Sequence, residues 1–297
     1  MGLLSDNTRW IFLLPNPTFH KIDERHIQDI AFGVKCLLKA GVDYENINIF
    51  IDNVSNVLTD YIFSYFEIKS PDKIFPTSEL ENIMTGNKKK NAVVFVTGHG
   101  SEEGMFADVP IKPYRLYKIF LEAPCLENTV FYFGQCYAGI FNFMPLSKHL
   151  NMRGKFTNDI VAIGATGFES SVSIRQQLPN EKVYDANIFL LNVYKWILEK
   201  KDIDGDGQLS VMDSFKYATI EVNKQLHNSE KQNLLQTVVS IETLLRTLQE
   251  KDKSTLSKEE RLKFELEEKT LQDSLEFYHI NQQSWILSEE TAMSVMF

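Results

Sequence analysis

The stretch NAVVFVTGHGSEEG, residues 91–104, joins a buried strand to a histidine. Residues 92–97 are mostly β-branched or aromatic, a composition typical of a strand that is covered on both faces. His99 follows this run and stands between two glycines. The stretch VFYFGQCYAG, residues 130–139, repeats the arrangement with Cys136 after its apolar run. Functional residues of parallel sheets gather beyond the carboxyl ends of the strands, so we expect His99 and Cys136 to share one sheet edge.

Similar apolar runs alternate with helical patterns along the first two thirds of the chain. Besides 92–97 and 129–134, strands are predicted at 9–15, 47–52 and 159–166. Helices are predicted at 23–41, 53–66, 78–86 and 113–122. Continuous apolar strands separated by helices predict the α/β class, with a mainly parallel sheet covered by helices on both faces.

The composition argues against nucleic-acid and membrane partners. The chain has 297 residues, 43% of them hydrophobic, and a formal net charge of −9. It has no basic stripe for phosphates and no apolar run of the roughly 18–20 residues that a membrane span needs. The three cysteines have no paired spacing and the N-terminus lacks a signal-peptide pattern, so we expect a cytoplasmic protein. Cys36 and Cys125 are expected to be small buried hydrophobic residues.

The sequence pattern changes near residue 227. A heptad-like apolar stripe follows, made by Leu234, Val238, Ile241, Leu245 and Leu248. Ser257 and Glu260 then form a capping box for another charged helix. We therefore expect an α/β domain at 1–227 and a helical hairpin with a C-terminal tail at 228–297. The stripe is open to two interpretations, packing within the protein or docking of another protein or a second protomer.

The sequence DIDGDGQLSVMD, residues 202–213, has the spacing of an EF-hand calcium loop. The predicted ligands are Asp202, Asp204, Asp206, Gln208 (through its carbonyl) and Asp213. Asp213 stands where glutamate is usual, and its shorter side chain predicts weak Ca²⁺ binding or a site shared with Mg²⁺. A solvated acidic turn is the alternative. Because there is one loop and not a pair, a stabilising or gating site is favoured over a calcium switch, and no organic cofactor is predicted.

His99 and Cys136 are the candidates for covalent chemistry. A thiol becomes a nucleophile near neutral pH when an imidazole takes or offsets its proton. The acyl-transfer intermediate also needs N–H donors aimed at its oxyanion, which Gly100 and the backbone of Cys136 can supply. Gly98 allows a sharp turn out of the strand, and Gly134 and Gly139 are expected to give the cysteine loop the same freedom.

These two stretches resemble the His-Gly and Cys loops of the caspase-fold cysteine peptidases, most closely the legumain-like branch. ERHIQDIAFGVKCLLKAGVDYENINIFIDN (24–53) resembles the first helix and second strand of legumains, and GATGFESSVS (164–173) resembles their Ser-Ser segment. The resemblance covers about residues 9–220 in order. It implies a caspase-like three-layer sandwich in which Cys136 is the nucleophile, His99 the base and Gly100 an oxyanion donor.

The resemblance also implies a specificity pocket. Arg25, Ser170 and Ser171 match pocket residues of legumains, and Asp185 is a loose counterpart of the pocket's acid. The alternatives are a first-turn surface arginine for Arg25 and a helix N-cap for Asp185. Legumains carry an acidic residue where this chain has Gly134, so the preferred P1 residue is left open among Asn, Asp and basic residues.

The leading hypothesis is therefore a cysteine endopeptidase that acts on polypeptides and carries a nearby Ca²⁺ site. The first alternative is a catalytically silent caspase-fold assembly or adaptor module, which acts through a protein partner or self-association at its C-terminal helices. The second is a calcium-binding adaptor, which leaves the glycine-flanked His99 and Cys136 unexplained.

Overall fold

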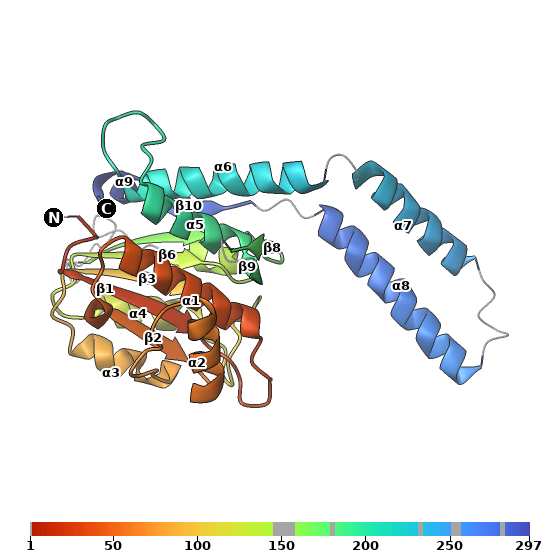
Figure 1. Cartoon of the computed structure of the whole chain (residues 1–297), viewed down its shortest axis with the longest axis horizontal. Helices are drawn as coiled ribbons and strands as arrows, with labels where there is room; N and C mark the ends of the chain where they lie inside the picture. The colour runs from red at the N-terminus through yellow and green to blue at the C-terminus, as the bar shows by residue number, and fades with distance from the viewer. Residues whose placement is uncertain (1, 145–157, 179–181, 231–233, 251–256, 280–282) are drawn as a thin grey trace. The chain divides into compact units, whose positions relative to one another are not determined.

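The stretch at 91–104 provides the central strand of a six-stranded sheet in the computed structural model (Figure 1). The structure describes residues 2–144, 158–178, 182–230, 234–250, 257–279 and 283–297. The sheet order is β10-β7-β6-β3-β1-β2. These strands are β1 (Thr8–Leu14), β2 (Ile47–Ile51), β3 (Asn91–Val96), β6 (Asn128–Phe133), β7 (Asp159–Gly164) and β10 (Trp285–Leu287). All neighbours pair in parallel except β10, which runs antiparallel to β7.

Helices cover both faces of the sheet. On one face lie α1 (Glu24–Lys39), α5 (Ile188–Glu199) and the start of α6 (Val211–Glu230): Phe12 contacts Tyr194 of α5, and the Tyr132 hydroxyl lies 2.6 Å from Ser214 Oγ of α6. On the other face, α3 (Leu80–Thr85) and α4 (Pro113–Leu121) pack on the alternate side chains of the same strands. The predicted α/β class, a three-layer sandwich around a mainly parallel sheet, is confirmed.

The pairing register places the two candidate residues at equal height. Val96 of β3 lies opposite Phe133 of β6, and His99 and Cys136 each come three residues after this pair. β3 is buried throughout and β6 is buried from Thr129 onward, as their apolar composition predicts. The register of the sheet therefore brings the two loops to the same edge.

Short elements complete this part of the chain. Its described residues also form α2 (Asn56–Tyr65), α9 (Glu289–Ser294) and 3₁₀ turns at Tyr44–Asn46, Thr77–Glu79 and Ala138–Asn142. Two hairpins and a strand were not predicted from the sequence: β4 (Gly100–Ser101) with β5 (Gly104–Met105), β8 (Ser173–Gln177) with β9 (Val183–Asn187), and β10. Among the cysteines, Cys36 is buried as expected, but Cys125 is exposed because it lies in a tight turn with φ +65°.

The chain divides into two compact units, Met1–Val222 with Gln282–Phe297, and Asn223–Asn281. The expected boundary at residue 227 placed the last residues with the hairpin, whereas β10 and α9 belong to the α/β unit. There Trp285 lies opposite Gly164, and the Leu3 N–H donates to the Met296 carbonyl at 2.7 Å. Within the described residues, no helix combines the length and the apolar character that a bilayer span requires.

The second unit contains the predicted helical hairpin, formed by α7 (Leu234–Gln249) and α8 (Lys258–His279). The capping box is present, since Ser257 N donates to Glu260 Oε2 at 2.9 Å and Glu260 N donates to Ser257 Oγ at 3.3 Å. In the apolar stripe, Leu248 is buried and Ile241 and Leu245 are half-buried, which favours packing within the protein for these three. The side chains of Leu234 and Val238 lie outside the described part.

Candidate active site

His99 leaves the central strand through a turn that requires glycine. Gly98 has φ +115°, a conformation that side chains with a Cβ rarely adopt. After His99 the chain forms the small β4–β5 hairpin, in which the Phe106 N–H donates to the His99 carbonyl at 3.0 Å. The predicted role of Gly98 in turning the histidine out of the core is therefore supported by its backbone angle.

Cys136 lies in a loop that is bonded to the segment following β7. The next residue, Tyr137, is left-handed (φ +53°), and its N–H donates to the Glu169 carbonyl at 2.8 Å. The Ser171 N–H lies 3.2 Å from Cys136 Sγ and points at the sulfur. This contact holds the half-buried thiol in one place at the carboxyl edge of the sheet.

The two loops touch through Gly100. A Cβ at this position would overlap the carbonyl oxygen of Cys136 and come within 2.8 Å of the Gln135 side chain. Only glycine lets the backbone that follows His99 pass this close to the backbone of Cys136. The roles of His99, Cys136 and Gly100 in catalysis stay predictions, and their placement is compatible with them.

Three histidines gather at this edge. The His99 ring lies 5.0 Å from the His26 ring and 5.4 Å from the His20 ring, each in an edge-to-face arrangement. Burial, and then the nearby positive charge of Arg25, lower the pKa of His99 below its ordinary value. An imidazole that stays neutral at pH 7 can accept a proton from a thiol.

Sequence reasoning passed over His26, which is 7% exposed on the inner side of α1. Its Nδ1 lies 3.0 Å from Thr97 Oγ1, and the Thr97 hydroxyl donates to Asp29 Oδ2 at 3.2 Å. Burial lowers the pKa of His26 to about 3 and raises the pKa of Asp29 to about 7. The signal in the sequence was the pair His26 and Asp29, which stand three residues apart on the apolar face of a predicted helix.

The residues expected to form a specificity pocket are only partly assembled. The Arg25 guanidinium binds Asp23 Oδ2 at 2.7 Å and Ser173 Oγ at 3.1 Å. Ser171 contacts Cys136 through its N–H and accepts from Asn187 Nδ2 at 2.9 Å, while Ser170 is exposed. The side chain of Arg25 therefore reaches the start of β8, two residues beyond Ser171.

Asp185 is exposed on β9, opposite Arg175 of β8. The alternative that Asp185 caps a helix is wrong, because Asn187 is the N-cap of α5 and accepts from Leu190 N at 3.0 Å. A pocket role for Asp185 stays a prediction.

The two residues that precede Cys136, Gly134 and Gln135, are enclosed by the surrounding structure. Gly134 was expected to give the loop conformational freedom, but its backbone φ lies outside the left-handed region, and a Cβ would come within 2.6 Å of Leu190. Packing against α5 therefore excludes a side chain here, including the acidic one found in legumains. Gln135 is 2% exposed, and neither atom of its amide has a hydrogen-bond partner among the described residues.

In the loop at 202–213, three carboxylates cluster on the surface and the fourth, that of Asp213, is buried. Oxygens of Asp202, Asp204 and Asp206 lie within 4.8 Å of one another on the surface. Lys216 Nζ lies 2.6 Å from Asp204 Oδ2, and this hydrogen bond holds the pKa of Asp204 below its ordinary value. The backbone N–H of Gln208 donates to Asp206 Oδ1 at 2.8 Å.

Asp213 is separate from this surface cluster. It is fully buried and accepts hydrogen bonds from Ile203 N, Ser210 N and Ser210 Oγ at 2.7–2.9 Å. In this conformation both oxygens of the Asp213 carboxylate accept hydrogen bonds from the loop itself. Metal coordination by Asp213 would therefore require these bonds to rearrange.

Comparison with known proteins gives one kind of match. No protein-family model and no curated protein matches the sequence. Among solved structures, the crystal structure of caspase-1 from Spodoptera frugiperda matches over 72% of this chain and 76% of that chain, with 13% identity and a TM-score of 0.41. This match gives no support to the legumain-like branch over other caspase-fold proteins.

Proposed function

We propose that the protein is a cysteine endopeptidase of the caspase-fold type, with Cys136 as nucleophile and His99 as general base. The observation that supports this most strongly is the matched register of the two loops. His99 comes three residues after Val96, and Cys136 comes three residues after Phe133, which lies opposite Val96. Gly100 packs directly on the backbone of Cys136. A neutral imidazole and an oriented thiol at one sheet edge are the two groups that thiol-mediated acyl transfer needs.

The proposed reaction follows from these groups. His99 takes the proton of Cys136, and the sulfur attacks the carbonyl carbon of the scissile bond. The N–H groups of Gly100 and Cys136 are the proposed donors to the carbonyl oxygen as it becomes negative. The tetrahedral intermediate then expels the amine, which receives the proton from His99, and water hydrolyses the thioester.

The proposed substrate is an extended polypeptide whose P1 side chain lies near Arg25, Ser170, Ser171 and Asp185. RHIQD at 25–29 and the two serines favour a legumain-like arrangement. Leu190 occupies the space that an acidic residue at position 134 would need, so the pocket would lack that charge. The ion pair of Arg25 with Asp23 leaves the P1 preference open between acidic, amide and basic side chains.

We also propose that the loop at 202–213 binds Ca²⁺, or Mg²⁺ more weakly, through Asp202, Asp204, Asp206 and the Gln208 carbonyl, with Asp213 as a further ligand after rearrangement. Three carboxylates at this spacing repel one another unless a cation offsets their charge. The C-terminal residues bind this loop, since the Phe297 N–H donates to the Leu209 carbonyl at 2.9 Å. A cation here would therefore stabilise the end of the chain as well.

The test is cleavage of a peptide library under reducing conditions, with Ca²⁺ and without transition metals. We expect cleavage by wild-type protein and its loss in Cys136→Ala and His99→Ala, while the matched control Cys125→Ala cleaves normally. Cleavage that persists in Cys136→Ala would overturn the proposal. Absence of cleavage in all variants would favour the catalytically silent assembly module instead.

A further inference from the structure

The His26 side chain carries a buried nitrogen that no described residue hydrogen-bonds. Its Nε2 atom has no hydrogen-bond partner among the described residues, although the residue is only 7% exposed. Nδ1 is engaged by Thr97, whose own hydrogen goes to Asp29. The Thr97 oxygen must therefore accept the hydrogen of Nδ1, which leaves a lone pair on Nε2. A buried acceptor without a donor is costly, so its surroundings indicate what it is suited to bind.

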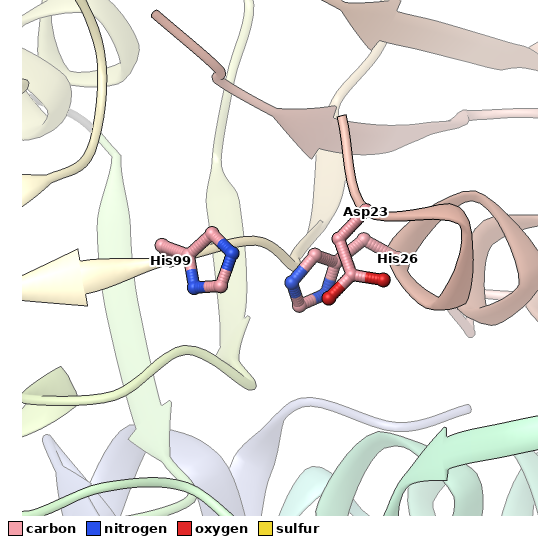
Figure 2. Close-up of side chains that lie close together, drawn as sticks. All are labelled: Asp23, His26 and His99. Carbon is pink, nitrogen blue, oxygen red and sulfur yellow. The ribbon is translucent and has the colours of Figure 1, made fainter. Parts of the chain in front are cut away.

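Two further side chains with metal-ligating atoms lie next to the His26 ring. Ligand atoms of Asp23, His26 and His99 all lie within 4.8 Å of one another. Figure 2 shows how they converge: His26 comes from the first turn of α1, Asp23 from just before that helix, and His99 from the segment after β3. The planes of the two imidazoles are 87° apart.

We propose that Asp23, His26 Nε2 and His99 form a binding site for a divalent transition metal such as Zn²⁺. Two imidazoles and one carboxylate are a ligand set that zinc accepts, with a fourth position left for water or another group. Zinc–ligand bonds of about 2.0–2.2 Å place tetrahedral donors roughly 3.4 Å apart. The three side chains therefore need to close by at most about 1.4 Å, which rotations of the half-buried Asp23 and His99 can provide.

The neighbouring groups suit this role. Ligating histidines are typically held by a second hydrogen bond on the other ring nitrogen, which Thr97 and Asp29 supply for His26. Asp23 is held by the N–H of Arg25 at 3.3 Å and by its guanidinium at 2.7 Å. The positive charge of Arg25 opposes a cation, and the carboxylate of Asp23, which is paired with Arg25, counters it.

The metal would take the lone pair of His99. This consequence rests on the proposed function: a peptidase whose base is bound to zinc could not accept the proton of Cys136, so bound zinc would act as a reversible inhibitor. The metal site itself does not depend on peptidase activity.

The test is equilibrium binding of Zn²⁺ to the full chain, by competition with a chromogenic chelator and with Ca²⁺ in excess to occupy the 202–213 loop. We expect one site that His26→Gln and Asp23→Asn each weaken by about 10-fold or more. Asp23 is partly exposed, so its variant reports on binding even if the buried His26→Gln variant folds poorly. The matched control is His20→Gln, a histidine that also contacts His99 but lies outside the donor group, and it should keep wild-type affinity.

The absorption spectrum of the Co²⁺ form identifies the ligands. We expect tetrahedral cobalt bands without a thiolate charge-transfer band, and the same spectrum in Cys136→Ala. Wild-type affinity in both His26→Gln and Asp23→Asn, or its loss in Cys136→Ala, would overturn the site. If the protein binds zinc as expected but cleaves no peptide, the metal site stands and the proposed function fails.

Discussion

Two features of its surroundings, burial and the charge of Arg25, reduce the proton affinity of His99. Both lower the pKa of this imidazole from its ordinary value of 6.5. A lower pKa extends the neutral, proton-accepting form to more acidic solutions. With a chelator present, we expect the acidic limb of the kcat/KM profile for peptide hydrolysis to lie below pH 6.5.

Arg25→Gln removes one of these contributions and should move the acidic limb to higher pH. The control is Arg175→Gln, which removes an exposed arginine of β8 and should leave the limb in place. An acidic limb above pH 6.5 in the wild-type protein, or one that Arg25→Gln does not move, would contradict this account of His99.

Gln135 has a buried side-chain amide with no hydrogen-bond partner in the part of the chain that the structure describes. Replacing it by methionine keeps the length of the side chain and removes the two unpaired polar atoms. We expect Gln135→Met to raise the free energy of unfolding by about 1–2 kcal/mol in urea denaturation. Gln177→Met, at an exposed position of β8, should change it by less than about 0.5 kcal/mol. A destabilised Gln135→Met protein would mean that the amide has a partner.

The helices and strands that could be predicted from the sequence are those marked by one strong sequence pattern. The strands β1, β3, β6 and β7 are continuous apolar runs, and Gly41, with φ +93°, ends the first helix as expected. Their order and register at the sheet edge were enough to bring His99 and Cys136 together before any side-chain contact was considered.

The elements that the sequence did not predict depend on tertiary contacts. In β9, Tyr184 and Ala186 are buried and alternate with exposed residues, a pattern visible in VYDAN but short and preceded by a polar loop. β10 has only three residues, and its Trp285 is placed by packing across Gly164. The histidine cluster was missed for the same reason, because its members come from three separate segments.

Trp285 packs the edge strand β10 against β7. Its ring occupies the space that a side chain at Gly164 would fill, and its Nε1 donates to the Thr166 carbonyl at 2.7 Å. We expect Trp285→Ala to weaken β7 by about 2–3 kcal/mol, less than for a fully buried tryptophan. Hydrogen exchange of Asp159–Gly164 measures this, with Leu262→Ala on the exposed side of α8 as the control. Unchanged protection of these amides would show that β10 is not needed at this edge.

In the 202–213 loop, Lys216 competes with a bound cation for Asp204. Lys216→Gln removes a positive charge and frees a carboxylate oxygen, so we expect Ca²⁺ affinity to rise by up to roughly fivefold. Isothermal titration measures the Ca²⁺ affinity. The control is Lys112→Gln, which changes the net charge by the same amount. Weaker binding in Lys216→Gln would argue that the lysine orders the loop and does not compete with the cation.

At the scale of the whole molecule, the chain returns to its first unit after the hairpin. The Phe297 ring packs edge-to-face against Trp196 with a centroid distance of 4.8 Å, and Val211 N donates to the Val295 carbonyl at 2.9 Å. This return could not be predicted from the sequence, because 283–297 is short and lacks a periodic pattern. The α/β unit therefore contains every proposed catalytic, pocket and metal residue, and the hairpin of α7 and α8 contains none of them. Leu262 and Leu266 on α8 are exposed apolar side chains that a protein partner could cover. A partner-binding role for the hairpin therefore stays a prediction.

The most direct test of the central claim is the site at which a peptidyl acyloxymethyl ketone labels the native protein, read by mass spectrometry of the digested protein. Such a probe reacts with a thiol that is activated within a substrate-binding site. We predict one label per chain on Cys136, its loss in His99→Ala, and normal labelling in Cys125→Ala. Labelling of the exposed Cys125 in preference to Cys136, or equal labelling of Cys136 with and without His99, would contradict the pairing of these two residues.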